Sequence, residues 1–285
     1  MTNTNGSTRN LTLVLGGTGK TGRRVAERLE ARSVPIRIGS RSAALPFEWN
    51  DPSTWAPVLQ DVASVYIVYY PDLAVPGAAD TVQAFVDQAV ESGVTHLVLL
   101  AGRGEEEADR TERIVQASGI DWTILRPTWF NQNFSEGFMR DLVLGGVVAL
   151  PVTDVREPFV DVEDIADIAV AALTEPGHKG QVYELTGPRL MTFQEAVGEI
   201  ARATGEDVAF VPISHEAFMS ALKEQEVSHE YIWLLGYLFS EVMDGRNSHL
   251  TDGVQRALGR PPRDFGDYAR EAAAAGFWEK QEIMA

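Results

Sequence analysis

Residues 11–22 read Leu-Thr-Leu-Val-Leu-Gly-Gly-Thr-Gly-Lys-Thr-Gly. The first five residues form a mostly apolar, β-favouring run, and Gly16, Gly19 and Gly22 follow it at intervals of three. Residues 23–30 continue with apolar side chains at helical spacing and charged side chains between them. A strand, a glycine turn and a helix in this order predict the phosphate-binding opening of a dinucleotide fold.

The glycines have separate physical reasons at this place. One allows the tight turn, one lets backbone N–H groups approach a pyrophosphate, and one lets the helix pack closely on the strand. Gly19-Lys20-Thr21 also looks like the end of a P-loop, which binds ATP or GTP. That loop needs another glycine five residues before Gly19, where this chain has Val14. The sequence therefore favours a dinucleotide over a nucleoside triphosphate.

Composition limits the class of protein. The chain has 285 residues, of which 45% are hydrophobic and 23% charged. This length and composition are sufficient for one domain with a large hydrophobic core and a smaller additional lobe. It has no cysteine, which excludes disulfides, thiolate catalysis and cysteine metal sites, and no metal is predicted. Residues 1–10 are polar and predicted to be disordered, without a signal peptide. With no apolar run of roughly 20 residues, we expect a cytoplasmic protein that does not enter a membrane.

Charge is distributed unevenly along the chain. The net charge of −17 argues against nucleic acid and anionic membranes as general partners. Residues 1–45 nevertheless hold eight basic and only two acidic side chains. A basic segment around the glycine turn of an acidic protein suits a polyanionic ligand. Some of these cations, such as Arg28 and Arg32, are expected to be solvated charges on a helix face.

The end of the second predicted strand, residues 35–39, indicates which dinucleotide is bound. An NAD site places Asp or Glu there, about 20 residues past the glycines, to bind the ribose hydroxyls. This chain has Ser40-Arg41-Ser42 instead. A guanidinium binds a 2′-phosphate with paired, charge-assisted hydrogen bonds, and Lys20 is a candidate second cation. The sequence therefore predicts NADP(H).

The ends of the next two predicted strands contain further candidate cofactor-binding residues. Residues 47–49 are predicted as a short third strand, with Glu48 or the backbone of Trp49 near the adenine. The following buried strand ends in Tyr69 and Tyr70. Because ligands of open α/β sheets bind at the carboxyl ends of strands, the tyrosines are expected to border the nicotinamide half. The alternative is that one of them belongs to the core.

Alternation of strands and helices continues through residue 127 and predicts a doubly wound parallel sheet. We expect helices over 77–92 and 105–117 and strands over 97–100 and 122–125. The later elements are expected to form a smaller α+β lobe: helix 131–145, strand 147–150, helix 161–172, strand 182–185, helix 193–203 capped by Thr192, strand 208–211 and a mostly helical 215–245. The predicted organisation is an NADP-binding Rossmann domain over 11–150 and a substrate-binding lobe over 151–285 that is interleaved with the sheet.

Several motifs together resemble the NmrA-like atypical short-chain dehydrogenase/reductases. They are residues 16–22 (Gly-Gly-Thr-Gly-Lys-Thr-Gly), 118–127 (Ser-Gly-Ile-Asp-Trp-Thr-Ile-Leu-Arg-Pro), 158–166 (Pro-Phe-Val-Asp-Val-Glu-Asp-Ile-Ala) and 259–265 (Gly-Arg-Pro-Pro-Arg-Asp-Phe). Residues 125–136 resemble in particular the branch of ergot-alkaloid-type iminium reductases. The resemblance implies an extended Rossmann fold, NADP(H) as cofactor and a C-terminal substrate lobe.

The motifs and strand ends give a set of expected cofactor-binding residues: Gly16, Thr18, Gly19, Lys20, Thr21, Gly22, Ser40, Arg41, Glu48, Trp49, Tyr70, Ala101, Gly102, Pro127 and Phe130. The chain departs from the wider superfamily in its acid–base residues. Standard members use a Tyr-x-x-x-Lys pair on the helix predicted here over 105–117, which contains neither residue type. Where many relatives have the lysine, this chain has Ala108 or Asp109.

Two functions remain open from the sequence. The first is an NADPH-dependent oxidoreductase that transfers hydride to a small conjugated or aromatic electrophile (an iminium or imine, a quinone or an enone). It would act mainly by positioning, with Tyr69, Tyr70 or a bound water as the candidate proton donor. The second is a non-catalytic NADP(H)-binding redox sensor that regulates a protein partner. A monomer or a homodimer is expected in either case.

Overall fold

The computed structural model describes residues 10–225 and 227–279. The chain divides into two units, each assembled from separated stretches. The first unit comprises the chain up to Ala101 with Glu107–Leu125 and Ala166–Val182; the second comprises Gly102–Glu106, Arg126–Ile165 and the chain from Tyr183 onward. The predicted disorder of residues 1–10 falls, except for Asn10, outside the described residues.

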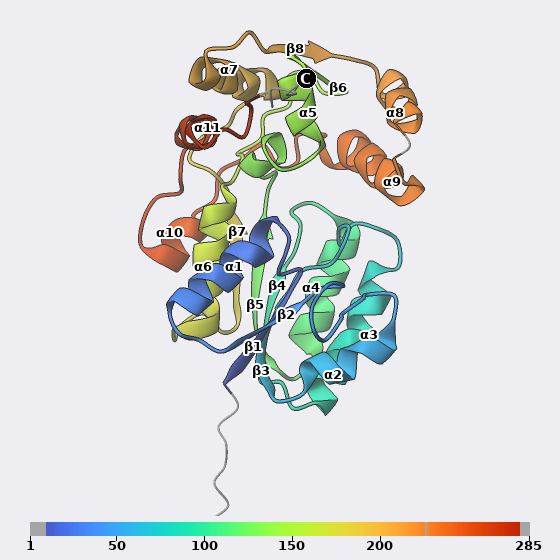
Figure 1. The fold of residues 1–285 in the computed structure, drawn as a ribbon, viewed down its shortest axis with the longest axis vertical. Coiled ribbons are helices and arrows are strands. Elements are labelled where there is room, and N and C mark those ends of the chain that lie inside the picture. Colours follow the sequence, from blue (N-terminus) through green and yellow to red (C-terminus); the bar gives the residue numbers. More distant parts are fainter. Residues whose placement is uncertain (1–9, 226, 280–285) are drawn as a thin grey trace, which may run out of the picture. The chain divides into compact units, whose positions relative to one another are not determined.

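A parallel sheet carries the glycine turn (Figure 1). Within the described residues its strand order is β2-β1-β3-β4-β5-β7, with β1 at Leu11–Leu15, β2 at Ile36–Gly39, β3 at Val62–Ile67, β4 at His96–Leu100, β5 at Asp121–Pro127 and β7 at Gln181–Leu185. The β1–β2, β1–β3, β3–β4 and β4–β5 pairs are parallel, which confirms the predicted fold class. Because β2 and β3 lie on opposite sides of β1, the strand order reverses there, and such a reversal is where open α/β sheets bind ligands.

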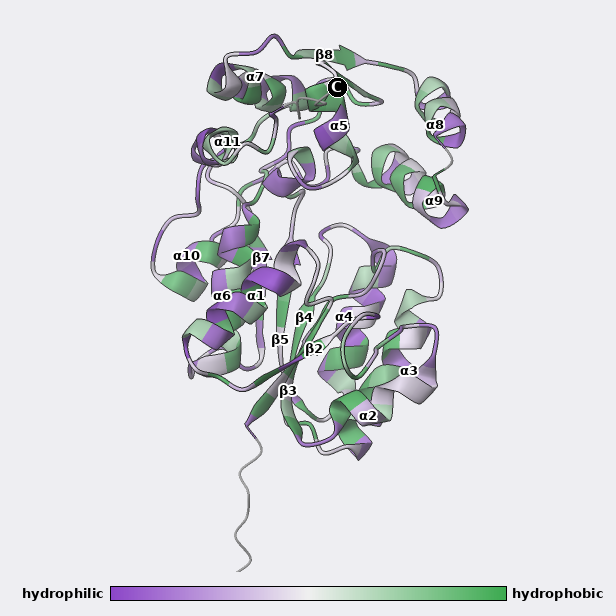
Figure 2. Cartoon of the chain, in the orientation of Figure 1, coloured by the Kyte–Doolittle hydropathy of each residue, from purple (hydrophilic) through white to green (hydrophobic). Residues whose placement is uncertain are grey.

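Helices cover both faces of this sheet, as Figure 1 shows. They are α1 (Lys20–Ala31), α2 (Trp55–Leu59), α3 (Ala78–Glu91), α4 (Glu106–Ala117) and α6 (Val162–Thr174). Every residue of β4 is buried, and Figure 2 shows the central strands as largely hydrophobic, as expected for parallel strands covered on both faces. In the described part of the chain, no helix has the length and apolar character that crossing a bilayer requires.

The strand predicted over residues 47–49 is wrong. This stretch is a loop in which Phe47 N donates to Ser40 O at 3.1 Å and side chains bind the backbone of Glu48. The indole Nε1 of Trp55 donates to Glu48 O at 2.8 Å, and Glu48 N donates to Thr54 Oγ1 at 3.1 Å. The indole Nε1 of Trp49 in turn donates to Val68 O at 3.1 Å. Phe47 and Trp49 of this stretch pack edge to face on Phe85, together with Trp55.

The second unit is built around an aromatic core. Its elements are α5 (Phe138–Leu144), β6 (Val147–Leu150), α7 (Phe193–Thr204), β8 (Ala209–Pro212), α8 (His215–Glu224), α9 (His229–Tyr237), α10 (Gly253–Leu258) and α11 (Phe265–Ala274). Strands β6 and β8 pair in parallel. Phe159 and Phe193 lie 5.1 Å apart, and Phe134 and Phe265 lie 5.6 Å apart, between ring centroids. Thr192 caps α7 in a reciprocal capping box, as predicted.

One helix of this unit is shorter than predicted. Residues 131–145 form a 3₁₀ turn at Asn131–Phe134 and only then α5. Gly137 interrupts the helix with an extended backbone, φ −150° and ψ −167°. The amide of Gln132 donates to the buried carboxylate of Asp161 at 2.8 Å. Tertiary hydrogen bonds therefore hold this turn in place of a continuous helix.

A buried histidine lies at the start of β4 in the first unit. His96 Nε2 is 3.2 Å from Thr123 Oγ1, whose hydroxyl donates to His178 O at 2.9 Å. Thr123 thus accepts from the His96 ring. Burial, assisted by the positive charge of Lys179, lowers the pKa of His96 from 6.5 to about 4.

This shift predicts an acid-dependent loss of stability. Because the unfolded chain binds the His96 proton near pH 6.5 and the folded chain only near pH 4, stability is complete above pH 6.5 and declines between pH 6.5 and 4. The decline attributable to His96 is at most about 3 kcal/mol. Urea unfolding at pH 7 and pH 4.5 should show a smaller pH effect in His96→Gln, which keeps an N–H donor but does not titrate. Equal pH effects in both proteins would contradict the assignment.

Candidate functional site

The glycine turn of the first unit has the geometry that phosphate binding requires. Gly16 follows β1 with a φ of +62°, a conformation that favours glycine. Its N–H donates to Gly39 O at 3.0 Å, and Gly19 N donates back to Gly16 O at 2.8 Å. The chain therefore reverses within four residues and enters α1 at Lys20.

The remaining glycines allow close contacts. A Cβ at Gly22 would lie 2.2 Å from Gly16 O, so helix α1 packs directly against the turn. A Cβ at Gly17 would lie 2.9 Å from the side chain of Ile38. Gly19, at the N-cap of α1, has a φ of −87° and ψ of −177° and contributes no side-chain cap. The first turn of α1 also contains no acidic residue, so this helix N-terminus fits the pyrophosphate of a dinucleotide.

Most arginines of the basic N-terminal segment bind carboxylates or backbone carbonyls of the first unit. The sequence did not show which of them do so. Arg24 donates to Lys20 O at 2.8 Å, Arg28 pairs with Asp167 at 2.9 Å, Arg32 pairs with Glu175 at 2.9 Å, and Arg37 donates to Val58 O and Gln60 O at 2.7 Å each. Arg28 and Arg32 thus remain partly exposed at the surface, as expected, and in addition each pairs with an acidic residue in or directly after α6.

Arg41 differs from these arginines. It is exposed two residues past β2. Its guanidinium carbon lies 6.0 Å from the centroid of the Tyr70 ring. Within residues 10–225 and 227–279, the Arg41 side chain forms no ion pair. The hydroxyls of Ser40 and Ser42 lie 3.4 Å apart on either side of it in the chain. These three side chains can receive an anionic group.

The other candidates of the first unit have different surroundings. The ring centroid of Trp49 lies 4.9 Å from that of the half-buried Tyr69, with the ring planes tilted by 41°. Glu48 O already accepts a hydrogen bond from Trp55. Tyr70 is 72% exposed. Ala101 is buried after β4, where its N–H donates to Leu125 O at 2.8 Å.

Three further candidates, Gly102, Pro127 and Phe130, belong to the second unit. Gly102 has the carboxylate of Glu105 folded over it, 2.0 Å from where a Cβ would be. Pro127 O accepts a hydrogen bond from Arg103 N at 3.1 Å, and Phe130 bridges to Val160. The structure therefore groups the candidate residues into two sets, one in each unit.

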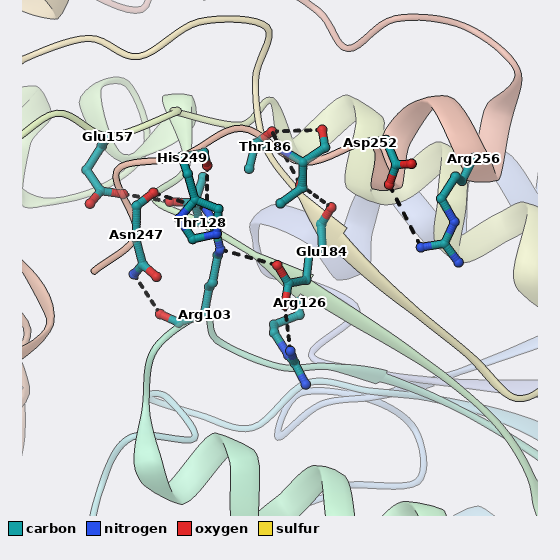
Figure 3. A network of polar contacts seen from close by, with 11 residues as sticks. Arg103, Arg126, Thr128, Glu157, Glu184, Thr186, Asn247, His249, Asp252 and Arg256 are labelled. Atoms are coloured by element: carbon teal, nitrogen blue, oxygen red, sulfur yellow. Dashed lines mark hydrogen bonds and ion pairs between the residues drawn. The ribbon is translucent and has the colours of Figure 1, made fainter. Parts of the chain in front are cut away.

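A buried polar network in the second unit was missed by sequence reasoning (Figure 3). Arg103, three residues after β4, is 5% exposed. Its guanidinium donates to Asn247 O at 3.2 Å and His249 O at 3.1 Å, and the Asn247 amide donates back to Arg103 O at 2.9 Å. Glu184 lies 3.7 Å from Arg103 and 2.7 Å from Arg126. No local pattern connects residues 103 and 247, so the sequence offered no signal.

This network fixes the tautomer of a histidine. Arg103 Nη2 contacts Nε2 of His249. Because a guanidinium has only donors, Nε2 accepts and the ring proton of the neutral imidazole is on Nδ1. The imidazole itself is exposed. Arg103 thus holds the loop around residue 249 in one conformation.

An unusual carboxyl lies in the same region. Glu157 is 2% exposed, and its Oε2 accepts from Thr128 Oγ1 at 2.6 Å. Oε1 of Glu157 has no hydrogen-bond partner among the described residues. Burial raises the pKa of Glu157, although the Thr128 bond and the charge of Arg103 oppose the shift.

Several named reductases and dehydrogenases are similar in sequence to this chain over most of its length. It is 30% identical over 287 residues to (4-alkanoyl-5-oxo-2,5-dihydrofuran-3-yl)methyl phosphate reductase of Streptomyces griseus, covering 92% of this chain and 98% of that protein. It is 29% identical to agroclavine dehydrogenase of Claviceps fusiformis, with coverages of 91% and 96%. It is 29% identical to the NAD(P)H azoreductase of Xenophilus azovorans, with coverages of 92% and 98%. No protein-family model matches.

Solved structures share the fold. The NADPH-dependent quinone oxidoreductase QOR2 of Escherichia coli, complexed with NADPH, has a TM-score of 0.76, 20% identity and coverages of 92% of this chain and 99% of that one. Triphenylmethane reductase of Citrobacter sp., complexed with NADP(H), has a TM-score of 0.73, 18% identity and the same coverages. NmrA, a negative transcriptional regulator in complex with NAD, has a TM-score of 0.68, 15% identity and coverages of 93% and 96%.

The relatives and the parallel sheet agree with the resemblance read from the glycine turn and the later motifs, and that prediction is confirmed. The chain belongs to the NmrA-like atypical short-chain dehydrogenase/reductase family of oxidoreductases.

Proposed function

We propose that this chain is an NADPH-dependent reductase that transfers hydride to a small conjugated or aromatic electrophile, such as an iminium, an imine, a quinone or an enone. The observation that carries the cofactor assignment is Arg41, which stands after β2 without a neighbouring carboxylate and without an ion pair in the described part of the chain. Relatives and neighbours named for azo, quinone, triphenylmethane and clavine chemistry support the substrate class.

In this proposal NADPH is held mainly by the first unit. The N-terminus of α1 around Gly19 binds the pyrophosphate, and Arg41 with Ser40 and Ser42 binds the 2′-phosphate. The other cofactor-binding residues expected from the sequence are part of this proposal. So is the division of the chain, in which residues 11–150 bind the cofactor and residues 151–285 bind the substrate. A monomer or homodimer and a cytoplasmic location also remain predictions.

The chemistry follows from what α4 lacks. Helix α4 contains neither tyrosine nor lysine, and Ala108 is buried while Asp109 is exposed. When bound, NADPH supplies the hydride; the protein contributes by holding donor and acceptor in reactive geometry. An iminium carbon is already positive and needs only the hydride. A quinone or enone also needs a proton, for which Tyr69, Tyr70 and a bound water are the candidates.

The missing tyrosine–lysine pair also favours a second function, an NADP(H)-binding sensor that regulates a protein partner without turnover. The two functions are separated by NADPH consumption, followed by absorbance against a panel of imines, quinones, enones and aldehydes. Turnover well above the rate without enzyme on any class excludes a pure sensor. NADPH binding without turnover on every class would favour the sensor.

Replacement of Arg41 tests the choice of cofactor. Arg41→Ala should weaken NADPH binding by roughly 1.5–3 kcal/mol, the range for a hydrogen bond to a charged group, and leave NADH binding nearly unchanged. Calorimetric titration with both cofactors measures this. Arg32→Ala is the matched control, because it removes the same charge from an arginine that pairs with Glu175. Equal losses for NADPH and NADH would contradict the 2′-phosphate assignment.

Replacement of Gly19 tests the phosphate site. Gly19→Val should abolish dinucleotide binding, because a branched side chain at the N-cap blocks the approach of backbone N–H groups to the pyrophosphate. The extended backbone of Gly19 is one that valine adopts readily. A Cβ there would lie 3.2 Å from Gly16 O, a tight contact that a shift of a few tenths of an ångström relieves. Thermal unfolding should therefore show a folded protein. A folded variant that binds NADPH with wild-type affinity would place the phosphates elsewhere.

The pH dependence of the reaction tests the positioning mechanism. On a pre-formed iminium, the rate should vary little between pH 6 and 8, because no enzyme group changes protonation in the rate-limiting step. A general acid would contribute ~100- to 10,000-fold and impose its pKa on the profile. Tyr69→Phe and Tyr70→Phe should both retain most of kcat. A hundredfold loss in either variant, with cofactor affinity intact, would identify a working acid and refute positioning alone.

A further inference from the structure

Arg41 and Tyr70 meet across the end of β1. The sheet order β2-β1-β3 places β1 between the two strands that precede these residues. Because neighbouring strands are ~4.8 Å apart, the ends of β2 and β3 are separated by about 10 Å. The guanidinium carbon of Arg41 nevertheless lies 6.0 Å from the centre of the Tyr70 ring. The two side chains therefore reach toward each other across the end of β1, the strand that leads into the glycine turn.

The glycine turn, residues 16–22, packs closely against side chains at the ends of β2 and β3. A Cβ at Gly16 would lie 3.3 Å from the side chain of Val68, which follows β3. A Cβ at Gly17 would lie 2.9 Å from Ile38 on β2. The ends of β2 and β3 thus pack closely on the turn, and Arg41 and Tyr70 follow these ends in the chain.

Tyr70 is a surface residue of the first unit. It is 72% exposed, whereas Tyr69 is half-buried and packs against Trp49 with ring centroids 4.9 Å apart. The guanidinium of Arg41 lies over the Tyr70 ring, 6.0 Å from its centroid. An aromatic face within about 6 Å attracts a guanidinium through the negative potential of the ring. The ring therefore restrains a long side chain that has no carboxylate to hold it.

We infer that Tyr70 is a cofactor-specificity residue that positions Arg41 for the 2′-phosphate of NADPH. The inference rests on the proposed binding of NADPH at Arg41. Restraint of the guanidinium lowers the conformational entropy that it loses when it binds the phosphate. NADH, which lacks this phosphate, gains nothing from the restraint. In this role Tyr70 acts through its ring, at the adenosine end of the cofactor.

A double-mutant cycle tests the coupling. Arg41→Ala, Tyr70→Ala and the double variant are titrated calorimetrically with NADPH, NADH and adenosine 2′,5′-bisphosphate, which has the 2′-phosphate but no nicotinamide. Tyr70→Ala should weaken NADPH and the bisphosphate by roughly two- to fivefold, the range for an exposed cation–π contact. NADH affinity should not change. In the Arg41→Ala background, Tyr70→Ala should cause no further loss.

Matched variants separate the ring from its hydroxyl. Tyr70→Phe keeps the ring face and should bind NADPH within about twofold of wild type. Leu45→Ala, which truncates another exposed apolar side chain, 41% exposed, controls for nonspecific surface effects. Equal weakening by Tyr70→Phe and Tyr70→Ala would overturn the inference in favour of the hydroxyl. A loss seen with NADPH but not with the bisphosphate would place Tyr70 at the nicotinamide end and overturn it as well.

The failure of the inference is distinguishable from failure of the proposed function. If Arg41→Ala weakens NADPH while Tyr70→Ala has no effect, the inference alone is wrong. The inference is also wrong if Tyr70→Ala causes the same loss in the Arg41→Ala background. If Arg41→Ala leaves NADPH affinity unchanged, the 2′-phosphate assignment falls and the inference falls with it.

Discussion

The close approach of Gly22 to the carbonyl oxygen of Gly16 is the constraint on which the nucleotide-binding unit depends. A Cβ at Gly22 would lie 2.2 Å from that oxygen, so no side chain fits there without displacing α1 from the turn. With α1 in place, its N-terminus lies at the carboxyl end of β1, and the sheet order puts β2 and β3 on either side. The backbone N–H groups of the glycine turn and of the start of α1 are positioned by that packing.

Buried charges organise the second unit in a different way. Asp164, fully buried, binds Arg260 at 2.7 Å and accepts from Arg263 N at 2.8 Å. Asp161 accepts from Glu163 N and Gln132, also at 2.8 Å. A buried charge left without its partner is strongly destabilising, so these contacts are expected to persist. The Asp164 contacts link the segment before α11 to α6, and the Asp161–Gln132 bond links the 131–134 turn to the start of α6. The motifs that identify the family at residues 158–166 and 259–265 thus serve its scaffold.

The departures from prediction share a cause. Residues 47–49 have the composition of a buried strand, yet side chains of Thr54 and Trp55 bind the backbone of Glu48. Residues 131–145 have a helical pattern, yet Gly137 and the Gln132–Asp161 bond divide the segment. Periodicity reports which side chains will be buried and does not report which tertiary partner will bind a backbone group. The long, strongly periodic elements, whose burial decides their conformation, were predicted correctly.

The sequence by itself determined the parallel sheet, the glycine turn, the arginine after β2 and the lack of a tyrosine–lysine pair in α4. These are consequences of residue types at short separations, where sterics and periodicity act locally. Only the tertiary structure decided which arginines are engaged, since Arg28 is paired with Asp167 while Arg41 lies against Tyr70. It also brought Arg103 to Asn247 and His249. Such contacts join segments far apart in the chain, and their formation depends on strand order and packing, which no local pattern encodes.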